Sequence, residues 1–132
     1  MDLKYLKEHE KVDKKYFEKF KNQIKKDGVL KRPIAADKKT KIILDGHYRY
    51  RSLKKLGYSK IPVILVDYTS SRILVKSWKK NVKITKEDVK KAGLSGKKLP
   101  SKTSKHMIIL SNRKYHISKI EKMIKIPLEE LK

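Results

Sequence analysis

The sequence predicts a small α/β (α+β) domain in which short helices flank a small mixed sheet. An amphipathic helical pattern at residues 14–27 precedes several short apolar runs that are bounded by turn residues. The chain has 132 residues, and domains usually have roughly 100–200 residues. We therefore expect a single domain over residues 1–132.

The pattern at 14–27 predicts the first helix. Asp13 is a suitable N-cap, because its carboxylate can accept a hydrogen bond from a free N–H group of the first turn, and Gly28 is a natural stop. One face is lined with Lys and Glu, and the opposite face carries Tyr16, Phe17, Phe20 and Ile24 at spacings of three and four.

Short strands are predicted at 33–36 and 41–44. The turn residues at 37–40 between them indicate a hairpin. Residues 61–67 form a continuous apolar run, which is typical of a strand buried on both faces. Pro62 must then lie at the start of this strand or at a sheet edge.

A second helix is predicted from about His47 to Leu56. Residues 71–77 fit a strand or a short helix, since their period is ambiguous. Thr85 is a suitable N-cap for a third helix that Gly93 would end.

The last third of the chain is less regular. Residues 94–106 are predicted to form a loop, and 107–110 a strand. Residues 115–126 fit a strand or a helix, and Pro127 is suited to begin a terminal helical turn over 127–131.

The composition is strongly basic. Lys and Arg number 37 against 14 Asp and Glu, which gives a net charge of +23. Nonspecific nucleic-acid binding through this charge and a general lysine-rich surface both explain the excess. The chain has no cysteine, so disulfides and thiolate metal sites are excluded. No apolar stretch reaches the ~18 residues of a membrane span, and the N-terminus does not resemble a signal peptide. We therefore expect a cytoplasmic protein that does not associate with membranes.

The most informative motif is Asp45-Gly46-His47-Tyr48-Arg49, where an apolar run ends and a helix begins. A glycine at such a junction lets the backbone turn sharply and lets a ligand approach. The free N–H groups of a helix start favour phosphate. His47 and Arg49 add side-chain donors, although cations oppose the helix dipole there. The motif therefore predicts a phosphate site, and the alternative is a strand–turn–helix joint that Asp45 caps.

This motif, with Leu53–Gly57 and Ile61–Val63 after it, resembles the ParB/sulfiredoxin superfamily. The resemblance implies that the segment binds nucleotide phosphates. One branch, the ParB partition proteins, binds CTP and DNA. The other, the free serine kinases, carries Asp-Gly-His-His-Arg and transfers a phosphoryl group from ADP or ATP to the hydroxyl of free L-serine, giving O-phosphoserine.

Four further segments resemble the kinase branch. They are His9-Glu10, Trp78, the run Ala92–Gly96 followed by Leu99–His106, and Pro127–Leu131. The chain departs from the kinase pattern in three ways. Tyr48 replaces a histidine, Ser104 replaces a threonine, and the region between Trp78 and Lys102 is shorter.

The resemblance implies a role for each candidate site residue. Glu10 would be the catalytic base. The Asp45 carboxylate, by its own chemistry, can accept a hydrogen bond from a loop N–H, contact the substrate, or hold Mg²⁺ together with phosphate oxygens and water. Nucleotide phosphates would bind Asp45, Gly46, His47, Tyr48 and Arg49. L-Serine would bind Trp78, Lys102, Thr103, Ser104 and His106. Residues 1–68 would form the nucleotide-binding core, and residues 69–132 a shortened substrate-side extension.

Each role has a plainer alternative. Glu10 can be a solvated acid, like Glu8. Residues 102–106 can be a solvated basic loop, and Trp78 a core residue. The rival function is a ParB-like DNA-binding or nuclease-like protein with nucleotide as a switch, although the sequence shows no helix-turn-helix and no acidic cluster for two metals. The four histidines are too dispersed in the sequence to indicate a zinc site. A monomer and a dimer both remain open.

Overall fold

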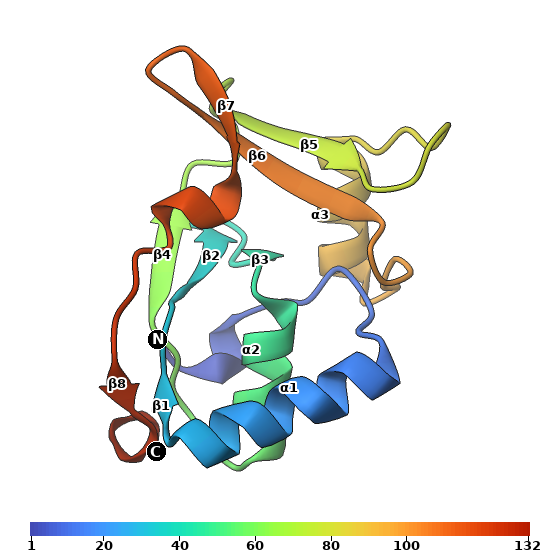
Figure 1. Cartoon of the computed structure of the whole chain (residues 1–132). Coiled ribbons are helices and arrows are strands. Elements are labelled where there is room, and N and C mark those ends of the chain that lie inside the picture. Colours follow the sequence, from blue (N-terminus) through green and yellow to red (C-terminus); the bar gives the residue numbers. More distant parts are fainter.

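The computed structural model describes all residues from Met1 to Lys132 (Figure 1). The helices are α1 (Lys14–Asp27), α2 (His47–Lys55) and α3 (Lys86–Ser95), and short 3₁₀ turns cover Leu3–Tyr5, Ile117–Ile120 and Leu128–Leu131. The strands are β1 (Val29–Leu30), β2 (Ile34–Asp37), β3 (Ile43–Asp45), β4 (Val63–Val66), β5 (Ile73–Ser77), β6 (Ser104–Leu110), β7 (Arg113–His116) and β8 (Ile126–Pro127). This architecture confirms the predicted α+β fold class.

The strands form two three-stranded sheets and a small pair. In the first sheet, of order β3-β2-β4, β2 pairs with β3 antiparallel and with β4 parallel. The second sheet, of order β5-β6-β7, is antiparallel, and β1 pairs with β8. Figure 1 shows the second sheet at the top, away from α1 and α2, and both chain ends on the side of β1 and β8.

The first half of the chain follows its local signals closely. Helix α1 begins after Asp13, whose Oδ1 accepts a 2.9 Å hydrogen bond from the Tyr16 N–H, and it ends before Gly28. The predicted hairpin is present as β2 and β3, and helix α2 begins at His47 as expected.

Strand β4 corrects one prediction. The apolar run at 61–67 does not form a strand buried on both faces, because β4 lies at the edge of its sheet and Leu65 is 42% exposed. Pro62 precedes the strand, as predicted, and its carbonyl accepts a hydrogen bond from the Ile34 N–H.

The second half corrects two more predictions and decides two open assignments. Gly93 does not end the third helix, which continues to Ser95. Gly93 instead lets α3 pack closely on Ile42, the residue before β3, because a Cβ at Gly93 would lie 2.7 Å from the Ile42 side chain. Residues 94–106 are not all loop, since Ser104 already begins β6. Of the two open assignments, 71–77 contains a strand and 115–126 contains the end of β7 and a 3₁₀ turn.

The buried side chains form two clusters. The first joins α1, α2 and the strands of the first sheet, with Ile24, Ile34 and Leu53 among its members. The second cluster packs Ile42 of the hairpin region against Ile108 and other residues of the second half. The second half of the chain therefore packs directly on the hairpin.

An extended segment at residues 7–11 joins the two halves. Lys7 pairs with Ile42 on one side, and Glu10 pairs with Leu99 on the other. Backbone hydrogen bonds of 2.8 Å run from the Leu99 N–H to the His9 carbonyl and from the Lys11 N–H to the Leu99 carbonyl. None of the helices is both long and apolar enough to cross a membrane.

Candidate active site

One large cleft, of about 700 Å³, gathers ten of the eleven predicted site residues. Thr103 is the predicted residue that does not line it. The cleft runs from the second sheet, past the start of α2, to the apolar face of α1. Its lining includes Glu10, Asp45, Gly46, His47, Tyr48, Arg49, Trp78, Lys102, Ser104 and His106.

The start of α2 is open toward an anion. It has no side-chain cap and no acidic residue in its first turn, so the N–H groups there have no partner within the helix. Gly46 turns the chain with φ 105°, and a Cβ on Gly46 would lie 2.4 Å from Cγ2 of Ile34. A glycine is therefore required at this position. Asp45 does not cap the helix, because α2 has no side-chain cap and the Asp45 carboxylate pairs with Arg49 instead.

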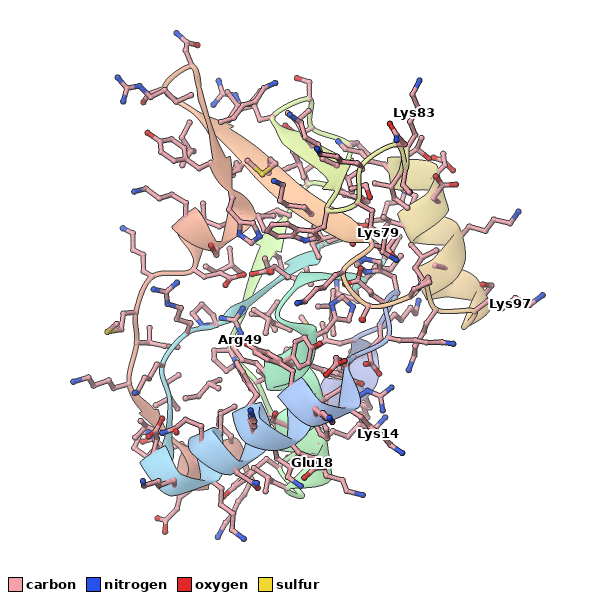
Figure 2. The ribbon with its side chains drawn as sticks, turned by 45° about the vertical axis from the view of Figure 1, so that its right-hand side comes forward. Lys14, Glu18, Arg49, Lys79, Lys83 and Lys97 are labelled. Carbon is pink, nitrogen blue, oxygen red and sulfur yellow. The ribbon has the colours of Figure 1, made fainter.

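Arg49 lies inside the molecule rather than on its rim. Figure 2 shows Arg49 between α1 and the second sheet, whereas Lys83 and Lys97 project outward. Its Nη1 donates to the Pro33 carbonyl at 2.9 Å. Its Nη2 donates to Asp45 Oδ2 at 3.3 Å and to Glu121 Oε1 at 2.8 Å.

Glu121 is a site residue that sequence reasoning missed. Its side chain is fully buried and meets the Arg49 guanidinium. Burial, together with the neighbouring Asp45, raises the pKa of Glu121 to about 8, and Arg49 opposes this shift. A proton on Glu121 near neutral pH therefore compensates part of the cost of burying this carboxyl group. No motif surrounds residue 121, so the sequence held no signal for it.

Glu10 is held by backbone N–H groups at the other side of the cleft. Its Oε1 accepts hydrogen bonds from the Thr103 N–H at 2.7 Å and from the Ser104 N–H at 2.9 Å. Burial raises the pKa of Glu10, while these hydrogen bonds and the charge of Lys79 partly lower it. The alternative of a solvated acid is therefore wrong for Glu10. It is also wrong for Glu8, whose side chain is 7% exposed and pairs with Arg51 at 2.7 Å.

Three histidines that are dispersed in the sequence meet at the wall of the cleft, which His47 and His106 line. The ring centroid of His9 lies 4.7 Å from that of His47 and 5.7 Å from that of His106. The His9 ring bonds to the Ile43 carbonyl through Nδ1 at 2.7 Å and to Ser104 Oγ through Nε2 at 2.8 Å. Because a carbonyl only accepts, Nδ1 of His9 carries the proton, and the Ser104 hydroxyl donates to Nε2.

These histidines are neutral. Burial lowers the pKa of His9 to about 4 and that of His106 to about 3. Burial also lowers the pKa of His47 well below its usual value, and His47 Nε2 accepts a 3.3 Å hydrogen bond from the His9 N–H. The prediction of a cationic His47 at the helix start is therefore wrong. Nδ1–H is the only donor left on this ring for a phosphate.

The remaining candidate residues are of two kinds: side chains exposed at the cleft, and side chains hydrogen-bonded within the protein. Trp78 is 55% exposed, so it is a wall of the cleft and not a core residue, and Lys105 lies over its ring at 4.6 Å. Lys102 is exposed at the cleft. The Thr103 hydroxyl donates to the Pro100 carbonyl at 2.6 Å, and His106 Nε2 bonds to the Tyr68 hydroxyl at 2.8 Å. Thr103 and His106 therefore support the site from within the scaffold.

The far end of the cleft is apolar. Tyr48 packs edge-on against Tyr16 with ring centroids 4.7 Å apart, and its hydroxyl accepts a hydrogen bond from the Asp13 N–H at 2.8 Å. Phe20 and Ile24 of α1 continue this wall. The helical pattern predicted this face of α1 but gave no sign that it lines a ligand cavity.

No group of three or more His, Cys, Asp or Glu side chains is arranged to hold a metal ion. Mg²⁺ usually takes one or two carboxylates and completes its shell with phosphate oxygens and water. The Asp45 side chain is one-quarter exposed and lines the cleft, so its carboxylate fits a role as one such ligand.

Comparisons with known proteins agree with this geometry. No protein-family model matches the sequence. The chain is 31% identical over 104 residues to an ATP-dependent L-serine kinase from Staphylothermus marinus, a match that covers 71% of this chain and 40% of the relative. It is 30% identical over 102 residues to an ADP-dependent L-serine kinase from Thermococcus kodakarensis, covering 71% and 42%. A ParB-like protein from Sulfolobus acidocaldarius is 48% identical over 46 residues, or 35% of this chain and 23% of the relative. The chain thus spans less than half the length of each of these curated relatives.

Solved structures share the fold. A free serine kinase in complex with AMP matches with a TM-score of 0.80 at 17% identity, covering all of this chain and 92% of that chain. SbnI from Staphylococcus aureus, with a C-terminal truncation, matches with a TM-score of 0.68 at 16% identity, covering 100% and 88%. The chain is therefore related in sequence to ParB-like and L-serine kinase proteins and has the fold of a free serine kinase. This confirms the resemblance to the ParB/sulfiredoxin superfamily.

Proposed function

We propose that this chain is a free serine kinase domain, which transfers a phosphoryl group from ADP or ATP to the hydroxyl of L-serine and produces O-phosphoserine. The observation that carries the proposal is that the Glu10 carboxylate and the open N-terminus of α2 line the same cleft. The curated relatives named as L-serine kinases support the same activity.

The nucleotide would occupy the half of the cleft between α1 and α2. Its phosphates would accept hydrogen bonds from the free N–H groups at the start of α2 and from Arg49. Its base would pack in the apolar end against Tyr48 and Phe20, where aromatic rings offer a stacking surface. A free serine kinase of the same fold has been solved with AMP and with ADP, which supports this use of the cleft.

L-Serine would bind between Glu10 and the second sheet. Glu10 Oε1 is engaged by the Thr103 and Ser104 N–H groups, and no hydrogen bond engages Oε2, which leaves it to accept the serine proton. The serine oxygen would form a bond to the terminal phosphorus while the bond to the leaving nucleotide oxygen breaks, and the proton would pass to Glu10. Lys102 is suited to neutralise the charge of the serine carboxylate or of the phosphoryl group, and Trp78 would close the side of the site.

Most of the acceleration would come from positioning and charge neutralisation, as is general for phosphoryl transfer. Asp45 is the residue that would hold Mg²⁺ together with the nucleotide phosphates and water. When bound, the ion supplies neutralisation of the phosphate charge. We further propose that residues 1–68 form the nucleotide-binding core and that residues 69–132 form the substrate-side extension.

Phosphorus NMR tests the proposal directly. The protein is incubated with Mg²⁺, L-serine and either ADP or ATP, and the spectrum is followed for O-phosphoserine. Glu10→Gln is expected to abolish turnover while leaving nucleotide affinity within about threefold, because it removes a proton acceptor and little volume. Glu8→Gln is the matched control, since Glu8 is also buried but lies outside the lining of the cleft.

A phosphoserine signal that requires Glu10 and survives Glu8→Gln supports the kinase and identifies its donor. No phosphoserine with either donor overturns it. Equal loss of turnover and nucleotide binding in Glu10→Gln assigns Glu10 a structural role instead.

Nucleic-acid binding remains the second prediction. The net charge of +23 favours it, because phosphate backbones recruit Lys and Arg without regard to sequence. A footprint at one DNA sequence that persists at raised salt would support a ParB-like function. Binding that weakens steeply with salt and shows no sequence preference follows from charge alone.

A further inference from the structure

Glu121 is a buried acid in the cleft region that the proposed reaction does not use. It follows the 3₁₀ turn Ile117–Ile120, and its side chain is fully buried. A carboxylate removed from water is costly unless a cation or a proton compensates it. Arg49, at 2.8 Å, is the cation that faces Glu121, and the raised pKa of Glu121 means that a proton also compensates its burial.

Arg49 is held from three parts of the chain. Its partners are the carbonyl of Pro33 before β2, the carboxylate of Asp45 at the end of β3, and the carboxylate of Glu121 after β7. A guanidinium group has five N–H donors, and these three contacts occupy three of them. The Nε–H and one Nη1–H are left without a protein partner.

Glu121 makes the shortest of the three contacts. The Asp45 contact is longer, at 3.3 Å, and the Pro33 contact engages only Nη1. The Arg49 side chain is 14% exposed, so it borders the cleft without being free in solvent. Glu121 and Pro33 therefore hold the two ends of the guanidinium group, Nη2 and Nη1, with the two short contacts.

We propose that Glu121 is a positioning residue for nucleotide recognition, which fixes the Arg49 guanidinium so that its two unpaired N–H groups meet the phosphates of a bound nucleoside diphosphate or triphosphate. The proposal rests on the proposed function for the identity of the ligand. Glu121 follows β7, which pairs with β6, the strand that begins at Ser104. Its contact with Arg49 thus links the serine side of the cleft to the phosphate side.

Glu8 provides a matched control for a merely structural ion pair. Its side chain is 7% exposed and accepts a 2.7 Å hydrogen bond from Arg51, which lies on the same helix as Arg49. Neither Glu8 nor Arg51 lines the cleft. The loss of an ion pair to α2 can therefore be compared at Glu121–Arg49, which borders the phosphate site, and at Glu8–Arg51, which does not.

Isothermal titration calorimetry of ADP tests the proposal, with adenosine as the ligand that lacks phosphates. Glu121→Ala is expected to raise the Kd of ADP by about tenfold or more, because Arg49 loses its strongest charge-assisted contact. The Kd of adenosine should change by less than about twofold. Glu121→Gln, whose amide oxygen still accepts from Arg49, should weaken ADP binding by about threefold or less. Glu8→Gln should lower the melting temperature while leaving the Kd of ADP within about twofold.

The proposal is overturned if Glu121→Ala binds ADP within about twofold of the wild type, or if Glu8→Gln weakens ADP as much as Glu121→Ala does. If Glu121→Ala fails to fold, Glu121→Asp replaces it, because one methylene less withdraws the carboxylate from Arg49. Binding is measured without turnover. The expected pattern of Kd values without phosphoserine formation would therefore overturn the proposed function alone, whereas phosphoserine formation with unchanged Kd values would overturn this inference alone.

Discussion

The glycine before α2 allows a sharp test of how the phosphate site is built. Gly46 has φ 105°, and a Cβ there would lie 2.4 Å from Cγ2 and 2.8 Å from Cβ of Ile34. Gly46→Ala therefore introduces backbone strain and a steric clash in one substitution. Two other glycines separate these effects. Gly57 has φ 89° with no atom within 4 Å of its Cβ position, and Gly93 meets Ile42 at 2.7 Å within a helix.

The expected costs follow from these contacts. A left-handed conformation costs an alanine about 1–2 kcal/mol, and overpacking a core costs about 1–3 kcal/mol. Gly46→Ala should therefore lower the free energy of unfolding by about 2–5 kcal/mol. Gly57→Ala carries only the strain, part of which is offset by reduced freedom of the unfolded chain, and should cost about 1 kcal/mol. Gly93→Ala carries only the clash and gains up to about 1 kcal/mol of helix propensity, so it should cost about 0–3 kcal/mol.

Urea denaturation followed by circular dichroism at 25 °C measures all three variants. The Kd of ADP should rise in Gly46→Ala but not in the other two, because only Gly46 precedes the open start of α2. The reasoning is refuted if Gly46→Ala costs no more than Gly57→Ala. It is equally refuted if Gly46→Ala is as stable as the wild type and binds ADP with the same Kd.

Three further predictions concern the histidines, the tryptophan and the first helix. Because the pKa values of His9 and His106 are lowered, their neutral forms contribute stability that is fully present above pH 6.5 and is lost as the pH falls through about 4 and 3. For His9 this contribution to the free energy of unfolding is about 3 kcal/mol. Nitrogen-15 NMR should show both rings neutral at pH 6, and a titration midpoint near 6.5 would contradict this expectation. Trp78→Ala should change the free energy of unfolding by less than about 1 kcal/mol, because the side chain is 55% exposed, while raising the KM for L-serine; an unchanged KM would argue against a role in the substrate site. Asp13→Ala should cost about 1 kcal/mol through loss of the N-cap, measured by thermal unfolding, and Asp13→Ser should restore most of it.

Features with a local cause were predictable from the sequence. The start of α1 at Asp13, the hairpin of β2 and β3, and the helix start after Gly46 depend on neighbouring residues alone. The end of α3 was not predictable in this way. As a local signal, Gly93 predicts the end of a helix. In the structure Gly93 packs against Ile42, some fifty positions earlier in the chain, and the helix continues past it.

The support of the site was not predictable because it is made by distant pairs. Arg49 and Glu121 are 72 positions apart, and His9 and Ser104 are 95 positions apart. Candidate residues for the proposed reaction could be named through the resemblance to the kinases, which covers Glu10 and the motif at 45–49. The burial of the histidines depends on the tertiary packing of both halves, and no local pattern records it.

The extended segment at residues 7–11 has a consequence for the proposed activity. It pairs with Ile42 of the first half through Lys7 and with Leu99 of the second half through Glu10 itself. In a protein that opens locally before it unfolds globally, separation of the halves would break one attachment and displace the carboxylate, while α1 and α2 stayed folded. Loss of the proposed transfer to serine would therefore be an early sign that the junction between the two halves has opened.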